Sequence, residues 1–235
     1  MNIPQAQIIP QTLAKKLIAG AAGQKLEVIY QAKKHQLLIE DEVGWLAKIY
    51  LPWTMDWTAG GGFKAKVDSH FSLVLIRAGQ AATGYFHLGE LIDHKVFRAY
   101  MIRQKQGFSQ IKYLKTKGKS RSGSRIRLAE TERFFEEINE RLNSYSDKFS
   151  MDFWGISCAK TMWPFYFSSE VSPPFSQKDE NLIELPVHIT QASLEELIAA
   201  GALVQRFHLI LSDRGKDALG ELNSGESGRT EEDNW

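Results

Sequence analysis

The chain has 235 residues, with 29 basic and 28 acidic side chains and a formal net charge of +1. This length can bury a substantial core, and balanced charge with 11% aromatic residues argues against wholesale disorder. No run approaches the roughly 18 apolar residues of a membrane span, the N-terminus lacks a signal-peptide pattern, and the only cysteine, Cys158, excludes an intramolecular disulfide. These features predict a cytoplasmic protein with no membrane partner.

The N-terminal part of the chain is predicted to be a small extension of one helix and a few strands. The helix is expected over 12–22, and strands over 26–30, 36–40 and 46–53. A glycine-rich break over 57–63 follows and places a domain boundary after residue 61. The predicted organisation is an extension over 1–61, a main domain over 62–222, and a disordered acidic tail over 223–235.

A meander of strands opens the main domain. Strands are expected over 71–77, 82–86 and 94–103, the last with period-two alternation of its side chains. A basic stretch follows, and then a helix over 124–144 with Glu137 and Arg141 one turn apart on its polar side. The residues predicted to form its apolar face are Leu128, Phe134, Phe135, Ile138 and Leu142.

Strands and helices alternate after this helix. Strands are expected over 153–158, 182–188 and 206–211, an irregular aromatic and proline-rich loop over 163–175, and a helix from Ser193, where Glu196 would complete a capping box. Cys158 falls on the first of these strands, where a buried, inert thiol is expected. The alternation predicts an α/β fold with a mixed sheet and flanking helices.

The stretch from 103 to 127 concentrates positive charge and contains no acidic residue. Lys and Arg displace condensed counterions from phosphates, so such a loop fits a polyanion such as RNA. Its glycines and like charges predict a projecting, poorly ordered loop, and a merely solvated basic loop is the alternative. The predicted RNA-binding side chains are Arg103, Lys105, Phe108, Lys112, Lys115, Lys117, Lys119, Arg121, Arg125 and Arg127.

Several short motifs in and before this stretch resemble those of one known family. They are Leu75-Ile-Arg-Ala-Gly79, Gly84, His94-Lys-Val, Gly107-Phe-Ser-Gln110 and Lys119-Ser-Arg-Ser-Gly-Ser-Arg-Ile-Arg127. Together they resemble the catalytic domain of the class-1 peptide release factors. The segment is most similar to the Vms-like release factors, the peptidyl-tRNA hydrolases of ribosome quality control, and to their stand-alone bacterial relatives. The resemblance implies an RNase H-like fold.

The resemblance also implies a reaction, which is hydrolysis of peptidyl-tRNA in the peptidyl transferase centre of the large ribosomal subunit, without a cofactor. The partners would be the ribosome with its rRNA and peptidyl-tRNA. Gln110 would orient the attacking water, because its amide is both donor and acceptor and stays neutral at every pH. Gly107 and Ser109 complete the catalytic motif. Phe108 departs from the family, which has a small residue there, and its ring either crowds the site or stacks on an RNA base.

The residues alone leave other functions open. A non-catalytic factor that occupies an empty ribosomal A site would use Phe108 and the basic loop for docking only. A nuclease would need several carboxylates at strand ends, for which Glu90, Asp93 and Asp152 are available without a recognisable spacing. The six histidines show no ligand spacing, which argues against a zinc site.

Overall fold

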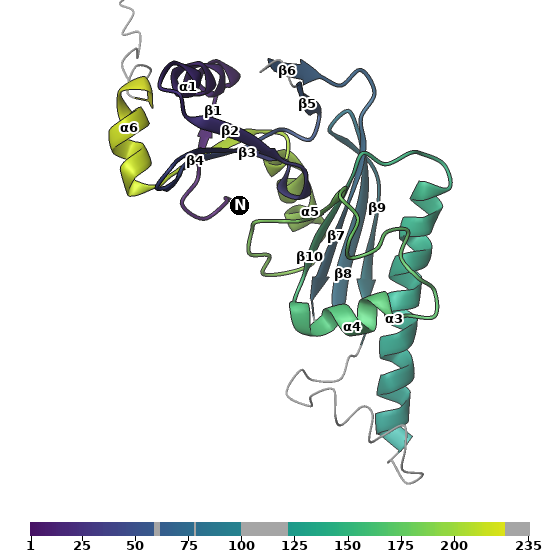
Figure 1. Cartoon of the computed structure of the whole chain (residues 1–235). Helices are drawn as coiled ribbons and strands as arrows, with labels where there is room; N and C mark the ends of the chain where they lie inside the picture. Colours follow the sequence, from purple (N-terminus) through teal and green to yellow (C-terminus); the bar gives the residue numbers. More distant parts are fainter. Residues whose placement is uncertain (59–61, 78, 100–121, 224–235) are drawn as a thin grey trace, which may run out of the picture. The chain divides into compact units, whose positions relative to one another are not determined.

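The computed structural model describes residues 1–58, 62–77, 79–99 and 122–223 (Figure 1). The chain divides into two compact units. Unit 1 comprises residues 67–202, and unit 2 comprises residues 2–66 together with the chain from Leu203 onward. In sequence, unit 1 is therefore inserted between two parts of unit 2.

Unit 2 is built on a five-stranded antiparallel sheet in the order β1-β12-β4-β3-β2. Its strands are β1 (Gln7–Ile9), β2 (Glu27–Gln31), β3 (Gln36–Asp41), β4 (Gly44–Tyr50) and β12 (Phe207–Leu211). The helices α1 (Gln11–Gly23) and α6 (Asp213–Asn223) contact each other and share one apolar core with the sheet. A short 3-10 helix (Ala32–Lys34) and the hairpin of β5 (Met55–Thr58) and β6 (Gly62–Ala65) complete the unit.

The core of unit 2 follows from two periodicities in the sequence. In α1, Leu13, Leu17 and Ala21 recur at helical spacing and are buried. In β3, Leu37 and Ile39 alternate with less buried neighbours and have no exposed surface. These two faces meet in the core, so burial of the apolar stripe of α1 holds the helix on the sheet.

Unit 1 contains a mixed five-stranded sheet in the order β11-β10-β7-β8-β9. Its strands are β7 (His70–Arg77), β8 (Gln80–His87), β9 (Glu90–Arg98), β10 (Phe153–Cys158) and β11 (Leu182–Glu184). The first three form an antiparallel meander, and β10 runs parallel to both β7 and β11. The helices are α3 (Ser122–Ser146), α4 (Trp163–Phe167) and α5 (Leu194–Leu203), with a 3-10 turn over Lys160–Met162.

The long helix α3 covers one face of this sheet (Figure 1). Four of the residues predicted for its apolar face are buried, namely Phe134, Phe135, Ile138 and Leu142, and the side chain of the fifth, Leu128, lies outside the described part. They pack in one cluster with Val74, Tyr85 and Ile156 from three different strands. The predicted face is confirmed at these four positions. Residues spaced three and four apart lie on one side of a helix, and that side faces the sheet.

The opposite face of the sheet contacts α5 through glycine. Successive side chains of a strand point to opposite faces, so Gly84 and Phe86 point away from the Tyr85 face. A Cβ on Gly84 would lie 2.9 Å from the Leu197 side chain of α5. A Cβ on Gly201 would lie 2.3 Å from the Phe86 ring, which is itself 2% exposed. Both glycines therefore permit close approach of helix and sheet.

Most predicted elements are present with shifted ends, three local expectations are wrong, and one helix was not predicted. The loop expected at 163–175 begins with the helix α4, because Pro164 is favourable in a first helical turn. The break expected at 57–63 contains a hairpin in which Trp57 pairs with Phe63. The strand expected over 182–188 ends at Glu184. Helix α6 was not anticipated.

One of the two contacts of the capping box predicted at the start of α5 is present. The Ser193 hydroxyl accepts a hydrogen bond from the Glu196 amide at 3.3 Å, which is the capping contact. The Glu196 carboxylate accepts a hydrogen bond from the Thr190 backbone amide at 3.2 Å. The second contact of the expected capping box is therefore made to Thr190, and it fixes the residues before the helix.

The boundary between the two units differs from the expected main domain over 62–222. Strand β12 pairs with β1 and β4, with Leu209 opposite both Gln7 and Ile49. The N-terminal strands are therefore not a separate extension, since their sheet is completed by a strand from the C-terminal part. The hairpin of β5 and β6 also belongs to unit 2, so the division falls between Lys66 and Val67. The expected tail over 223–235 lies outside the described residues except for Asn223.

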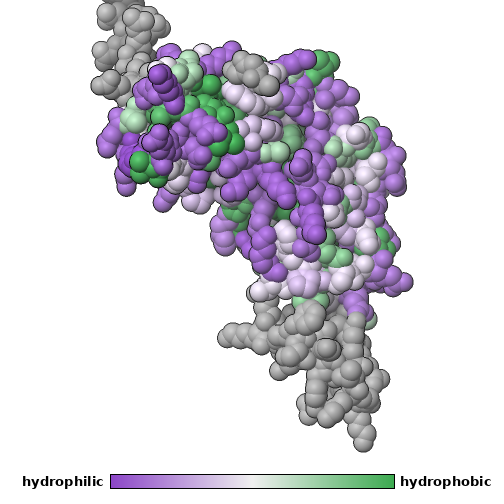
Figure 2. Space-filling view, viewed as in Figure 1, coloured by the Kyte–Doolittle hydropathy of each residue, from purple (hydrophilic) through white to green (hydrophobic). Residues whose placement is uncertain are grey.

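The visible surface is largely hydrophilic. In Figure 2, hydrophilic residues cover most of the described surface in that view, and the most extensive apolar area lies over unit 2. The exposed large apolar side chains of unit 2 include Ile8, Val43 and Trp45. Among the described helices, none combines the length and apolar character required to cross a membrane.

A buried histidine of unit 2 contacts strand β2 on one side and the loop after β4 on the other. His35 is 1% exposed and has a left-handed backbone with φ of 45°. Its Nδ1 lies 2.7 Å from the Tyr30 hydroxyl, and its Nε2 lies 3.1 Å from the Pro52 carbonyl oxygen. A neutral ring satisfies both contacts, with Nε2–H donating to Pro52 and the Tyr30 hydroxyl donating to Nδ1. Burial is the main cause that lowers the pKa of His35 to about 4.

We expect this histidine to make unit 2 sensitive to acid. Because its folded pKa of about 4 lies below the ordinary value of 6.5, the unfolded chain binds the proton more tightly. The stabilising contribution is complete above pH 6.5 and is lost as pH falls toward 4, about 3 kcal/mol in all. Urea denaturation should give a larger free energy of unfolding for the wild type than for His35→Asn at pH 7. The difference between the two free energies should be smaller at pH 4. Asparagine tolerates the left-handed backbone.

The matched control for this experiment is His94→Gln, which removes an exposed histidine from β9. Any change in stability that His94→Gln shows between pH 7 and pH 4 is subtracted from the change shown by His35→Asn. A gap between wild type and His35→Asn that stays constant over this interval would contradict the assignment.

Candidate functional site

The segment that carries the predicted catalytic motif connects β9 to α3. Gly107, Phe108, Ser109 and Gln110 lie outside the described residues, as do the predicted RNA-binding side chains from Arg103 to Arg121. The prediction that this stretch forms a projecting loop therefore also concerns residues outside the described part. Arg125 and Arg127 belong to the first turns of α3, which begins at Ser122. The structure thus describes the two elements that hold the segment at its ends.

On the N-terminal side, the segment is held by the edge strand of the sheet. Strand β9 pairs with β8 and forms the last strand in the described sheet order. Phe97 is 4% exposed and reaches the core shared with α3, while Val96 is 38% exposed on the other side. The Ala99 amide donates to the Gly79 carbonyl oxygen at 2.9 Å. The chain therefore leaves β9 beside the turn that joins β7 and β8.

An ion pair joins α3 to this edge strand. The Arg141 guanidinium donates to both oxygens of Asp93, at 2.6 and 2.5 Å. Its Nε also donates to the Tyr145 hydroxyl at 3.2 Å. Both contacts to Asp93 come from Nη2, and this charge-assisted pair together with the tyrosine contact holds the helix against the strand. Glu137, one turn before Arg141, accepts instead from Arg133 at 2.8 Å.

A buried amide secures α3 from its other side. Asn139 has no exposed surface, and its Nδ2 donates to the Val171 carbonyl oxygen at 2.8 Å. The same group contacts the Tyr166 carbonyl oxygen of α4 at 3.4 Å. A buried amide requires such partners, so the position of the 166–171 backbone is tied to that of α3. The apolar periodicity of the helix gave no signal for this contact.

Cys158 is not a nucleophile in this structure. Its side chain is buried at the end of β10, as predicted. Burial raises its pKa to about 12, and the opposing effects of Arg77 and Lys160 are smaller. A thiol with this pKa carries no significant thiolate at neutral pH.

The three carboxylates considered for a nuclease have other roles or positions. Asp93 pairs with Arg141, and Asp152 accepts the His70 backbone amide at 2.8 Å. Glu90 is exposed at the first position of β9. Within the described residues, these carboxylates do not form a group whose oxygens could share one metal ion. The arrangement gives no support to a nuclease.

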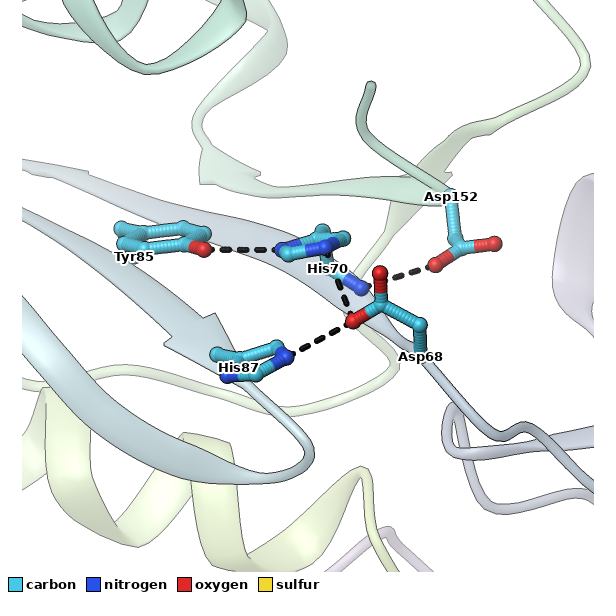
Figure 3. A network of polar contacts seen from close by, with 5 residues as sticks. All are labelled: Asp68, His70, Tyr85, His87 and Asp152. Atoms are coloured by element: carbon cyan, nitrogen blue, oxygen red, sulfur yellow. Dashed lines mark hydrogen bonds and ion pairs between the residues drawn. The ribbon is translucent and has the colours of Figure 1, made fainter. Parts of the chain in front are cut away.

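A different polar cluster lies at one end of β7 and β8 (Figure 3). Asp68 precedes β7, while His70 begins β7 and His87 ends β8. The Asp68 Oδ1 atom lies 3.0 Å from Nε2 of His70 and 2.7 Å from Nε2 of His87. Hydrogen bonds from His87 and then His70 lower the pKa of Asp68. Sequence reasoning missed this cluster.

The register of the hairpin explains why the two histidines meet. Pairing runs outward from Arg77 opposite Gln80 to His70 opposite His87. The sequence offered one signal for this contact. If the hairpin is centred on the turn after Arg77, counting residues outward along both strands places the two histidines opposite each other. Directly opposite residues share a face, so their rings stack with centroids 4.7 Å apart.

Comparison with known proteins gives one family match. A family model described as bVLRF1, Bacteroidetes VLRF1 release factor, matches residues 71–211, which run from β7 to β12. A solved structure described as "Vms1 mitochondrial localization core" is similar with a TM-score of 0.43 and 10% sequence identity, covering 85% of this chain and 92% of that chain. No curated protein matches the sequence.

Proposed function

Because the chain belongs to the bVLRF1 release factors, we propose that it is a ribosome-associated peptidyl-tRNA hydrolase that frees nascent chains from stalled ribosomes. The observation that carries this proposal is the family match over residues 71–211, since it encloses Gly107-Phe-Ser-Gln110 and the basic stretch around it. The sheet of unit 1 is compatible with the RNase H-like type, because a three-strand meander is followed by β10 parallel to its first strand.

The proposed mechanism uses positioning instead of a strong base. Peptidyl-tRNA is an ester, and the ribosome already holds it in place for acyl transfer. The Gln110 amide can accept a hydrogen bond from a water and donate another, so it can orient that water toward the ester carbonyl. Gly107 allows the backbone to approach closely, and the Ser109 hydroxyl is a further donor and acceptor. A backbone amide of the motif would stabilise the oxyanion.

The frame described above supports this role. The segment leaves a paired edge strand and enters a helix of 25 residues whose middle is fixed by Arg141 and Asn139. Loops that carry function are commonly positioned by a rigid scaffold in this manner. The first backbone amides of a helix have no partner within the helix, so the start of α3, with Arg125 and Arg127 in its first turns, favours a phosphate of rRNA or tRNA.

A peptide-release assay tests the proposal. Purified protein is added to stalled ribosome–nascent-chain complexes, and the free peptide is separated from peptidyl-tRNA on a gel. We expect release that depends on the protein and on intact ribosomes. The absence of release above background would favour the second candidate, a non-catalytic A-site factor. That candidate has its own support, since Phe108 occupies a position where a small residue is usual and can stack on an unpaired base.

The basic loop is expected to provide most of the salt-dependent affinity for ribosomes. Replacing Lys115, Lys117 and Lys119 with alanine should weaken binding and reduce the slope of log affinity against log salt by about 3, because each lysine would neutralise one phosphate. Sedimentation of ribosomes with the protein at several salt concentrations measures both quantities.

The matched control removes three lysines from elsewhere. Lys33, Lys34 and Lys64 lie in unit 2, and all three are exposed. Their triple alanine variant has the same net charge as the test variant and should keep the wild-type slope. Equal slopes for the two variants would show that net charge, and not this loop, determines binding.

A further inference from the structure

We propose that Asp68, His70 and His87 bind one divalent transition-metal ion in unit 1. Their ligand atoms all lie within 4.8 Å of one another. Two imidazoles and one carboxylate are a donor set that suits Zn²⁺ and its first-row neighbours. None of these three residues belongs to the Gly107–Gln110 motif, and the proposal does not depend on the proposed hydrolase activity.

The two imidazoles are oriented by the sheet before any ion binds. His70 and His87 are directly opposite in the ladder of β7 and β8, and their ring planes differ by 13°. Both Nε2 atoms therefore point toward the same Asp68 oxygen, as Figure 3 shows. Convergent ligands on paired strands lose little freedom when an ion binds, which favours affinity.

The ring nitrogen of His70 that faces away from Asp68 has a hydrogen-bond partner. Histidines that bind a metal usually have such a partner at the nitrogen that does not bind the ion. The Tyr85 hydroxyl lies 2.8 Å from Nδ1 of His70, and Tyr85 is 4% exposed. With a metal on Nε2, the proton resides on Nδ1 and is donated to the tyrosine oxygen. The ring of Phe149 stacks on His70 with centroids 5.2 Å apart and limits its rotation. The hydroxyl can act as donor or acceptor, so the same arrangement serves both states.

The space between the ligands fits an ion after a small movement. Ligand atoms of a tetrahedral zinc site with bonds of 2.0–2.1 Å are about 3.3 Å apart. The distances from Asp68 Oδ1 to the two nitrogens are 3.0 and 2.7 Å, so the carboxylate must move outward by several tenths of an ångström. Asp68 is 66% exposed and precedes the strand, which leaves it free to do so. The exposed side lets the ion approach from solvent and leaves coordination positions for water.

Zinc alone is the probe for the test. Untagged full-length protein is stripped with a chelator, titrated with ZnCl₂ in a calorimeter, and its metal content is measured by mass spectrometry after gel filtration. We expect one zinc per chain in the wild type, and no displacement by excess Mg²⁺, because Mg²⁺ prefers oxygen ligands. In His87→Gln and Asp68→Asn, the affinity should fall by roughly 100-fold or more, beyond the range typical for loss of an outer-shell contact.

His94→Gln is the matched control, since it removes an exposed histidine from the next strand of the same sheet. It should bind zinc as the wild type does. Circular dichroism checks that each variant is folded. The two substituted ligands, Asp68 at 66% and His87 at 38% exposure, are both less buried than His70 at 17%. The proposal is overturned if wild type binds no zinc, if His87→Gln and Asp68→Asn keep the wild-type affinity, or if Mg²⁺ displaces the zinc. The peptide-release assay tests the hydrolase independently of these outcomes.

Discussion

Gln110→Ala is expected to slow peptide release from stalled ribosomes by roughly 100-fold or more, the effect typical of losing one group that positions or stabilises a transition state. Ribosome affinity should stay within about twofold of the wild type, because binding is attributed to the basic side chains and not to the amide. The loss belongs in the rate constant, since the side chain acts on a water in the transition state. Single-turnover release at saturating protein, with binding measured separately, distinguishes the two quantities.

Gln104→Ala provides the matched control for this result. It removes the same side chain from the same basic segment but lies outside the Gly107–Gln110 motif. Its release rate should equal that of the wild type. If Gln110→Ala released peptide as fast as Gln104→Ala, the water-positioning role would be wrong. Equal background release by all three proteins would instead support the A-site binding factor.

Gly215→Ala is expected to destabilise unit 2 by about 3 kcal/mol or more, at the upper end of the usual cost of overpacking. A Cβ at this position of α6 would lie 2.0 Å from the Leu46 carbonyl oxygen. That oxygen is main chain in β4 and already accepts the Ser212 amide at 2.9 Å. It cannot move without breaking this bond and disturbing the sheet. Urea denaturation followed by tryptophan fluorescence measures the loss.

The same helix contains its own control at Gly220. A Cβ there would have nothing within 4 Å, and the residue lies in the helix interior. Gly220→Ala should therefore raise stability by about 0.5–1 kcal/mol through helix propensity alone. Hydrogen exchange of β4 peptides should be faster in Gly215→Ala and not in Gly220→Ala. Equal stability of the two variants would show that α6 does not pack on β4 as described.

Periodic patterns predicted the fold of unit 1 well. Strands β7, β8 and β10 are buried along nearly their whole length, and the apolar stripe of α3 records one buried face. Burial is the signal that a single sequence carries best. The position of β12 could not be predicted in this way. Its apolar run predicts that the strand is buried. The run does not indicate that the strand pairs with β1 and β4, because these strands are distant in sequence.

In the candidate site, too, local features could be predicted from the sequence, and contacts between distant elements could not. Gly84 was identified through a family motif, and the structure supplies its physical reason, which is the 2.9 Å approach of Leu197. The partner of Arg141 could not be predicted, because helical spacing brings only Glu137 near it in the sequence, whereas the pair formed is with Asp93 on another element. The cluster of Asp68, His70 and His87 was missed because its spacing has meaning only once the hairpin register is known.

The pairing of β12 sets the order in which a newly synthesised chain can fold. Unit 1 closes within one continuous stretch, whereas β4 waits for a neighbour that is made about 160 residues later, since Ile49 pairs with Leu209. At a synthesis rate of about 5–20 residues per second, the wait lasts roughly 10–30 s. During this time β1 has no strand to join, and the edge of β4 can accept a strand from another chain. The nascent protein is therefore most vulnerable to aggregation through unit 2.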